Sequence, residues 1–405
     1  MALGLAVLAF VASNIAWKDE LMWYRAPLGE GEDLKAQPAL VVQGTLVGDW
    51  KEDLVHFVLD DDAEFEEGWP SEPAALLISA GEGGLEVQRR SSKKHSIGFD
   101  WRPGVPRAFR DVKSSGLFVG TLLIALGLLL CIYRWRLLLA IAGCPASLLE
   151  TARLTLLGYF FNLVMPGMTG GDLIKGVVVA RNNPKRRTDA LVSIVVDRVI
   201  GLLALMALTG VTLLVAGEEF SELRLPIWGL VVAVFGGALI YANPRLRALF
   251  RVEQILQKLP LGDKLQALDR AAVIYLRHPV KLAIAGLLSL GNHTFIILGV
   301  WVFGRSFGVD AESVSLGEFF VVVPVANIVG ALPLAPGGWG LGEAVYKGLF
   351  ERIGASGALG VATSVTFRLT QLGFGLLGGV YLLLPSGRQA VREAESLSAE
   401  DRGAA

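Results

Sequence analysis

The sequence has few of the residues that carry metal, redox or nucleophilic chemistry. Its 405 residues include two cysteines and four histidines. Cys131 and Cys144 have no partner at metal-ligand spacing and the histidines form no H-x-x-x-H pair, so nothing predicts a metal site. A P-loop, a nucleophile elbow and a dinucleotide fingerprint are also missing. We therefore expect no enzymatic activity, no cofactor and no nucleic-acid partner.

Charge is scarce as well, and apolar residues take its place. Charged residues make up 19% of the chain and apolar residues 53%, with a mean hydropathy of +0.53, which is above the usual range of soluble domains. Several apolar runs approach the roughly 18 to 20 residues that a helix needs to cross the bilayer. The sequence therefore predicts a polytopic α-helical protein of the plasma (inner) membrane. The expected spans are 115–135, 190–216, 225–242, 281–303 and 356–384.

The two ends of the chain differ from this pattern. Residues 2–17 are apolar but short for a span. No basic residue precedes them, which favours a retained first helix or signal anchor over a cleaved signal peptide. Residues 113–384 would form the transmembrane domain, and residues 385–405 a polar cytoplasmic tail.

The segment 18–112 is polar and acidic. It contains 19 acidic and 11 basic residues, a net charge of −8, whereas the whole chain carries −1. Alternating or β-rich pieces at 39–46, 54–59 and 84–89 are separated by Gly, Pro and Asp clusters. This pattern is typical of a small soluble β-rich domain.

Two further apolar stretches are interrupted by Gly/Pro clusters. The stretch 148–180 is broken at 166–172, and the stretch 316–350 is broken at 333–343. Proline removes a backbone donor and glycine lowers helical propensity, so neither cluster should lie inside a continuous helix. Broken backbone is tolerated at membrane depth only where protein or a water-filled cavity lines it. We therefore predict two re-entrant or broken helical hairpins.

Short basic loops are expected on the cytoplasmic side. The acidic connection around Glu218, Glu219 and Glu222 and the segments 305–312 and 351–352 should then face outward. This assignment makes the β-rich domain extracytoplasmic, and the two hairpins enter the membrane from opposite faces. The basic groups that we assign to the cytoplasm are Arg134 and Arg136, Arg181, Lys185, Arg186 and Arg187, the segment 245–281, and Arg388 and Arg392.

The two hairpins also resemble each other in sequence. Asn162 precedes Gly170 and Gly171, and Asn327 stands similarly before a second Gly-Gly pair. A serine-to-arginine segment follows each hairpin, at 193–198 and again at 364–368. A pattern that occurs twice in opposite orientations predicts an inverted repeat, and transporters usually place their substrate site at the interface of such repeats.

Charged residues inside spans are the first candidates for a binding site. Asp197, Arg198 and Arg368 lie within apolar segments, where a charge is costly and normally faces the bundle interior. Each arginine either contacts substrate or forms a structural ion pair. Adjacent residues of a helix point apart, so Asp197 and Arg198 need different partners.

The hairpin tips supply the remaining candidates. Asp172 and Glu343 can cap helix N-termini, Lys175 can meet an anionic headgroup or only the membrane surface, and the glycines either expose N–H groups to phosphate or serve tight turns. The candidate substrate-binding residues are Asn162, Pro166, Gly167, Gly170, Gly171, Asp172, Lys175, Asp197, Arg198, Asn327, Pro336, Gly337, Gly338, Gly340, Glu343 and Arg368.

Two other segments have a simpler interpretation. His293 with Asn292 is more typical of interhelical hydrogen bonding than of a proton relay. The basic segment 243–279 has helical periodicity, which predicts an amphipathic cytoplasmic helix on anionic lipid, with a solvated connector as the alternative.

Several of these motifs together resemble a known family. The residues are Tyr133-Arg-Trp-Arg136, Asn162-x-x-x-Pro166-Gly-x-x-Gly-Gly-Asp172, Asp197-Arg198-x-x-Gly201, Pro336-Gly-Gly-x-Gly-x-Gly-Glu343 and Arg368. Across about 115–384 the chain looks like the flippase-like family typified by the transmembrane part of lysylphosphatidylglycerol synthase. The resemblance implies translocation of an aminoacylated phospholipid or assistance to polyprenyl-linked glycan assembly. Only a short tail follows the last span, so the synthases' aminoacyl-transferase activity is not carried over.

Two hypotheses of function follow from the sequence. The first is a lipid flippase or transporter that binds a phosphate-bearing headgroup, of a phospholipid or a polyprenyl phosphate, near the membrane midplane. The second is a scaffold that does not transport and assists an envelope glycosyltransferase or a lipid-modifying enzyme, with the β-rich domain as the docking surface.

Overall fold

The structure is a computed structural model. It describes residues 17–24, 40–60, 77–81, 84–89, 98–164, 170–258, 262–309, 314–330 and 340–381. Residues 2–16 of the predicted first helix and the polar tail at 385–405 lie outside these residues.

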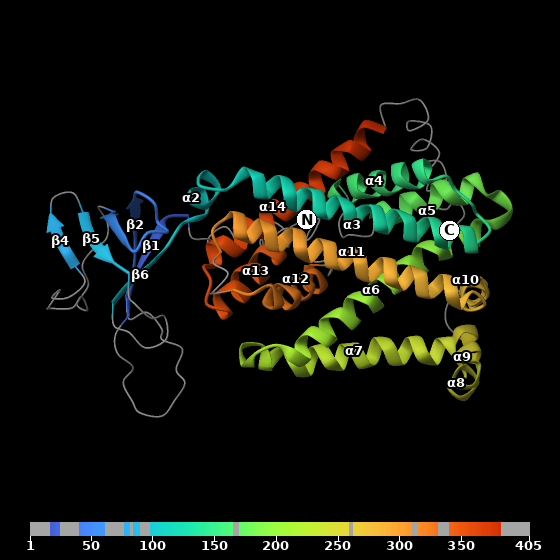
Figure 1. Cartoon of the computed structure of the whole chain (residues 1–405). Helices are drawn as coiled ribbons and strands as arrows, with labels where there is room; N and C mark the ends of the chain where they lie inside the picture. Colours follow the sequence, from blue (N-terminus) through green and yellow to red (C-terminus); the bar gives the residue numbers. More distant parts are fainter. Residues whose placement is uncertain are drawn as a thin grey trace.

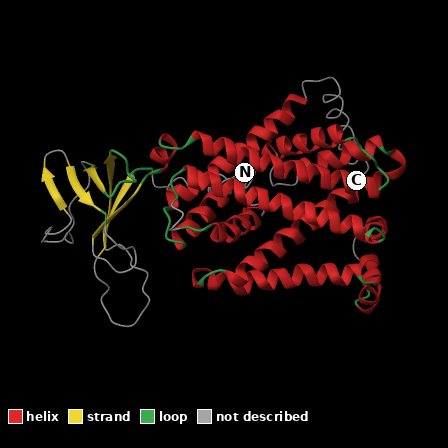
Figure 2. Ribbon diagram, viewed as in Figure 1, coloured by secondary structure: helices red, strands yellow, loops and turns green. Residues whose placement is uncertain are grey.

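The acidic N-terminal segment contains an antiparallel sheet of six strands, as the β-rich pattern predicts (Figure 2). The strand order is β4-β5-β3-β2-β1-β6. Alternate side chains of the strands are buried, among them Leu46, Phe57, Val87 and Trp101, because successive side chains of a strand point to opposite faces. The strands are β1 Asp19–Tyr24, β2 Leu40–Val47, β3 Leu54–Leu59, β4 Leu77–Gly81, β5 Gly84–Gln88 and β6 Gly98–Arg102.

A buried ion pair joins the sheet to the helices. Asp19 on β1 accepts hydrogen bonds from Arg107 Nε at 2.6 Å, the Leu46 backbone N–H at 2.9 Å and the Gly104 N–H at 2.8 Å. Arg107 lies on the short helix α2 (Val105–Arg110), which leads into the first long helix. A hydrogen-bonded buried pair of this kind fixes geometry, because loss of either partner leaves an unpaired charge. The sheet is thereby held at one end of the helical part (Figure 1).

The rest of the described chain is helical, and the protein is an integral membrane protein with several candidate spans. Four long helices, α3, α6, α7 and α11, are long and apolar enough to cross a membrane. The helices are α3 Ser114–Ile141, α4 Leu148–Val164, α5 Gly170–Asn182, α6 Arg187–Val215, α7 Ser221–Ala242, α8 Pro244–Leu249, α9 Val252–Lys258, α10 Gly262–Leu276, α11 Pro279–Ser306, α12 Leu316–Gly330, α13 Leu341–Arg352 and α14 Gly357–Tyr381.

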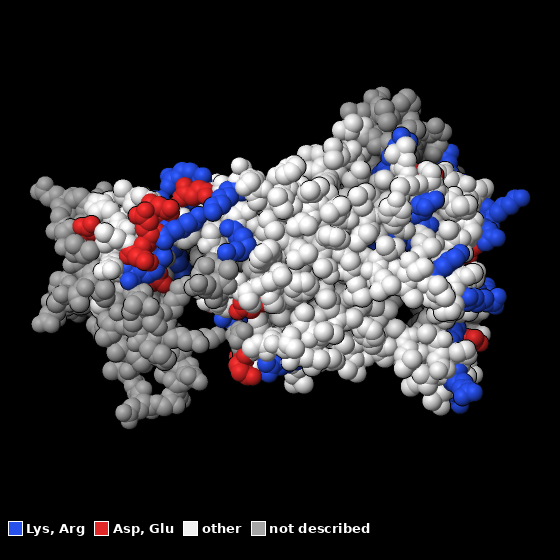
Figure 3. All heavy atoms as spheres, viewed as in Figure 1, with Lys and Arg blue, Asp and Glu red and all other residues white. Residues whose placement is uncertain are grey.

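Charge is distributed along the molecule as a membrane requires. On the face drawn in Figure 3 the middle of the helical part is almost free of charged side chains. Lys and Arg gather at the end that carries α8, α9 and α10, and charges of both signs surround the sheet at the other end. An apolar belt between two charged ends is what a bilayer selects, since charged groups are costly in hydrocarbon.

The two short-helix pairs lie toward opposite ends of this belt (Figure 1). The pair α4/α5 ends beside the basic loops, where Asn182 donates a hydrogen bond to Glu150 and Gly143 packs against Arg186. The pair α12/α13 ends on the sheet side, where Arg352 pairs with Glu222 of the acidic connection. Helix α4 packs on α14, α12 packs on α6, and α3 lies along α11. The breaks at 165–169 and 331–339 lie outside the described residues.

Helix ends follow local signals in both halves. Helices α3 and α11 each end just before a glycine with positive φ, Gly143 at 71° and Gly308 at 96°. This left-handed conformation suits glycine because it has no Cβ. Pro279 stands in the first turn of α11, where its missing N–H costs nothing.

Two sequence-based predictions are corrected here. The segment 243–279 is not one amphipathic helix but three short ones, α8, α9 and α10; Arg251, with φ of 52°, separates α8 from α9. Helix α3 also continues six residues past the predicted end at 135, to Ile141. Arg134 is therefore in a helix and buried, not in the basic cytoplasmic loop to which we assigned it.

Candidate functional site

The first short-helix pair carries a cluster of three charges. Asp172, the third residue of α5, pairs with Arg198 on α6 and with Lys175 Nζ at 2.6 Å. Asn162 on α4 contacts the residue before Asp172: its Oδ1 accepts a hydrogen bond from the Gly171 backbone N–H at 2.9 Å. These residues come from α4, α5 and α6 and were all predicted as site residues.

The second pair repeats this arrangement. Glu343, the third residue of α13, accepts a hydrogen bond from Arg368 Nε at 2.5 Å. The same carboxylate accepts hydrogen bonds from the Gly340 backbone N–H at 2.6 Å and from the Ser364 hydroxyl at 3.2 Å. Glu343 therefore caps its helix, as one of the interpretations of the sequence predicts, and binds the arginine at once.

The register of the two clusters is the same. In each, an acidic third residue of the short helix meets an arginine that is the twelfth residue of the following long helix, Arg198 in α6 and Arg368 in α14. The sixth residue of the short helix differs: it is Lys175 in α5 and Tyr346 in α13.

A third buried pair lies beside the first cluster. Arg134 Nε and Nη2 donate to the two carboxylate oxygens of Asp197 at 2.7 and 2.9 Å, and Arg134 Nη1 donates to the Ser289 hydroxyl at 2.7 Å. Asp197 and Arg198 thus have different partners, as their positions on the helix predict. This pair ties α3, α6 and α11 together, so Asp197 holds a structural arginine and does not join the cluster of Asp172.

Arg134 is the functional-region residue that sequence reasoning placed wrongly. Its position at the end of the predicted span 115–135 suggested the cytoplasmic boundary, whereas it is 5% exposed and lies inside α3. The signal that could have found it was the need of Asp197 for a basic partner inside the membrane part. The neighbouring Trp135 also contributes, because Lys175 Nζ lies 4.9 Å from the centre of its ring, within the range of a cation–π interaction.

The remaining predictions divide into described and undescribed residues. Pro166, Gly167, Pro336, Gly337 and Gly338 lie outside the described residues. Gly170 begins α5, and Asn327 is half-buried on α12. His293 Nε2 donates to the carbonyl of Gly201 at 3.1 Å, which confirms an interhelical hydrogen bond between α11 and α6.

The glycines of the clusters permit close approach. A Cβ on Gly171 would lie 1.9 Å from the carbonyl oxygen of Gly158, and a Cβ on Gly342 would lie 2.0 Å from Arg368 Nη2. The Gly171 position therefore requires glycine, because its neighbour is backbone, whereas at Gly342 the flexible Arg368 side chain would have to shift. From the sequence, the structural role expected of the hairpin glycines was only to form tight turns.

The chemistry of these clusters is ionic. The described residues contain no group of three His, Cys, Asp or Glu side chains that could hold a metal ion. What the arrangement supplies is guanidinium and ammonium groups held in position by carboxylates. Such groups bind phosphate or carboxylate through charge-assisted hydrogen bonds.

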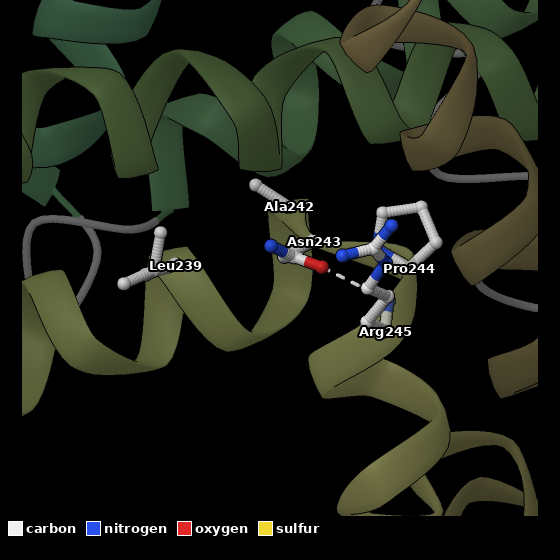
Figure 4. Close-up of a pocket in the computed structure, with 5 residues that line it drawn as sticks. All are labelled: Leu239, Ala242, Asn243, Pro244 and Arg245. Carbon is white, nitrogen blue, oxygen red and sulfur yellow. Dashed lines mark hydrogen bonds between the residues drawn. The ribbon is translucent and has the colours of Figure 1, made fainter.

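A separate cavity of about 500 Å³ lies at the corner between α7 and α8 (Figure 4). Its lining includes Leu239, Ala242, Asn243, Pro244 and Arg245. The Asn243 side chain accepts a hydrogen bond from the Arg245 backbone N–H at 2.9 Å and so caps α8. None of the residues of the charged clusters lines this cavity.

The fold and the clusters define an integral helical membrane protein with paired charges buried in its spans. Residues 98–379 match the family model described as "Lysylphosphatidylglycerol synthase TM region", and the chain belongs to this family. The match begins at β6 and includes every described helix from α2 to α13 and nearly all of α14.

A relative from Methanothermobacter thermautotrophicus supports the assignment. This "UPF0104 membrane protein" is 24% identical over 246 residues, which is 56% of this chain and 72% of the relative. The name states a membrane protein and no activity.

Proposed function

We propose that the protein binds a phosphate-bearing lipid headgroup between its two short-helix pairs and moves it across the membrane. The headgroup would belong to a phospholipid or to a polyprenyl phosphate, and its acyl or prenyl chains would stay in the lipid. The observation that carries the proposal is the repeated ion pair: a carboxylate at the start of a short helix holds an arginine at the twelfth position of a long one. Charges inside membrane helices usually mark a substrate or ion path.

The arrangement of the helices supports an inverted repeat as the framework of this site. The unit α3 to α6 would correspond to α11 to α14, each with a long helix, two short helices and a second long helix. The short pairs lie toward opposite ends of the molecule (Figure 1), and the cross-packing of α4 on α14 corresponds to that of α12 on α6. In transporters with such repeats the substrate lies at the repeat interface. The basic end would then be cytoplasmic and the sheet extracytoplasmic.

Scrambling of fluorescent phospholipid and polyprenyl phosphate in proteoliposomes tests the proposal. Arg198→Ala and Arg368→Ala should each slow scrambling about tenfold or more, because each removes a charge-assisted hydrogen bond to the headgroup or the joint that places it. Arg245→Ala is the matched control: it removes the same charge from an exposed position on α8 and should leave the rate unchanged. Unchanged scrambling by folded Arg198→Ala and Arg368→Ala protein would exclude the mechanism.

A scaffold function is the second candidate, and the sheet supports it. One face of the sheet is buried, whereas Val41, Val47, Leu54 and Val58 on the strands are exposed. Such a surface suits a protein partner, such as an envelope glycosyltransferase or a lipid-modifying enzyme. Deletion of residues 18–112 distinguishes the two functions. If the deleted protein no longer co-purifies with a partner but still scrambles lipid, transport is favoured. If the partner loses its activity and the protein scrambles no lipid even when intact, the scaffold is favoured.

A further inference from the structure

The two ion-pair clusters differ in net charge. Asp172, Lys175 and Arg198 sum to one positive charge, whereas Glu343 and Arg368 sum to zero. The difference comes from the sixth residue of the short helix, which is Lys175 in one cluster and Tyr346 in the other. The neighbouring Arg134–Asp197 pair is neutral. Only the first cluster has a positive charge that its own carboxylate does not balance.

The clusters also differ in access. The Arg198 side chain is 51% exposed although it pairs with Asp172, whereas the Arg368 side chain is 13% exposed and Glu343 is 4% exposed. The carboxylate of Glu343 already accepts hydrogen bonds from Gly340, Ser364 and Arg368. The polar groups of the Glu343 cluster therefore bind one another, whereas the exposed side chain of Arg198 can also contact a ligand.

The surface around Arg198 suits an amphiphile. Val195, Val199 and Leu202 are all exposed, at 58%, 45% and 41%. Val195 and Leu202 lie one turn before and one turn after Arg198 on the same side of α6, and Val199 lies one turn after Val195. The side chain of one basic residue thus emerges from a continuous apolar stripe, which matches a lipid with an anionic headgroup and chains that run along the helix.

From these observations we infer that the two clusters have different roles in the proposed function, on which this inference rests. The cluster of Asp172, Lys175 and Arg198 is the receptor for the headgroup, and it selects lipids whose headgroup has a net negative charge. The cluster of Glu343 and Arg368 is a positioning joint that holds α13 against α14. Because the two clusters differ in net charge and exposure, the headgroup binds from the side of α4 and α5.

Competition between lipids in native mass spectrometry tests this assignment. The full chain is purified in mild detergent and mixed with equal amounts of phosphatidylglycerol, which is anionic, and phosphatidylcholine, which is zwitterionic. The wild type should retain phosphatidylglycerol about tenfold more than phosphatidylcholine, since one charge-assisted hydrogen bond supplies selectivity of this order.

Two variants remove the excess charge by different routes. Arg198→Gln removes the exposed guanidinium, and Lys175→Tyr gives the first cluster the residue of the second. Both should reduce the preference to less than twofold, while Arg198→Lys should keep most of it. Arg368→Gln should lower the thermal unfolding temperature, but its folded fraction should keep the preference, as should the exposed control Arg245→Gln.

The possible failures are distinguishable. A wild type that binds both lipids equally, or a preference that survives both Arg198→Gln and Lys175→Tyr, overturns the assignment of the receptor and leaves lipid binding intact. A preference abolished in folded Arg368→Gln protein overturns the division of roles. A wild type that retains neither of these lipids, nor a polyprenyl phosphate offered in a parallel sample, contradicts the proposed function itself.

Discussion

At the scale of single residues, the close approach of α4 and α5 requires glycine at position 171. Gly171 faces the backbone of Gly158 so closely that a Cβ would lie 1.9 Å from its carbonyl oxygen. The backbone cannot yield as a flexible side chain can, so α4 and α5 approach through glycine. The Gly171 N–H also donates a hydrogen bond to Asn162 Oδ1. The two contacts fix the first turn of α5, where Asp172 pairs with Arg198.

Gly171→Ala should therefore destabilise the protein by about 2 kcal/mol or more, the cost of overpacking a tight contact. The measurement is the thermal unfolding temperature in detergent. Gly286→Ala on α11 is the matched control, because a Cβ there meets nothing within 4 Å, and alanine favours the helix. An equal effect of the two substitutions would refute the packing role of Gly171.

Sequence reasoning located most charged residues of the site but not their pairing. The positions of Asp172, Arg198, Glu343 and Arg368 were evident because charges stand out in apolar runs. Which carboxylate meets which arginine depends on packing between helices that are distant in the chain. Arg134 was misplaced for a related reason, because hydropathy locates a helix end only to within a few residues. An arginine near a helix end is expected at the membrane surface, whereas Arg134 is buried in a pair with Asp197.

At the scale of elements, an ion pair joins two of the three short helices at the basic end, α8 and α10. Arg247 on α8 donates two hydrogen bonds to Asp269 on α10, at 3.0 and 2.7 Å, and both side chains are nearly buried. Burial raises the pKa of Asp269, but the hydrogen bonds of Arg247 and Tyr241 and the charges of Arg247 and Arg270 together outweigh it and lower the pKa. The carboxylate is thus charged and bound at neutral pH.

A lowered folded-state pKa fixes the sign of the pH dependence. The stabilisation by Asp269 is fully present above the ordinary aspartate pKa of about 4 and is lost as the pH falls through the lower folded value. Asp269→Asn should weaken the α8–α10 contact by about 2 kcal/mol at pH 7. Hydrogen exchange should show faster exchange in α8 and α10, with wild-type protection constant from pH 7 to about 5. Equal exchange in the two proteins would contradict this role.

The long helices could be predicted from sequence, whereas the break inside the segment 243–279 could not. Apolar runs gave α6, α7, α11 and α14 nearly to their ends, because hydropathy reports burial in lipid directly. The segment 243–279 kept its helical periodicity across a break at Arg251, so the pattern predicted one helix where three form. Periodicity cannot detect a single residue with positive φ when that residue is not glycine.

At the scale of the whole molecule, the sheet and the membrane part are firmly joined. Besides the Asp19–Arg107 pair, Trp50 and Lys51 pack against Gly308 at the end of α11, and Phe109 meets Phe307 with ring centres 5.2 Å apart. The sheet thus adjoins the end to which α12 and α13 return (Figure 1). The acidic composition of 18–112 predicted a separate β-rich domain, but not this contact, because contacts between distant segments are not encoded in local patterns.

A structure in lipid nanodiscs tests whether a lipid headgroup binds at the Asp172–Arg198 pair inside the membrane part. We expect Asp172 and Glu343 to lie between the two headgroup layers, with phosphate density within hydrogen-bonding distance of Arg198. Density that places both carboxylates in bulk water beyond the bilayer, with no lipid at Arg198, would contradict it.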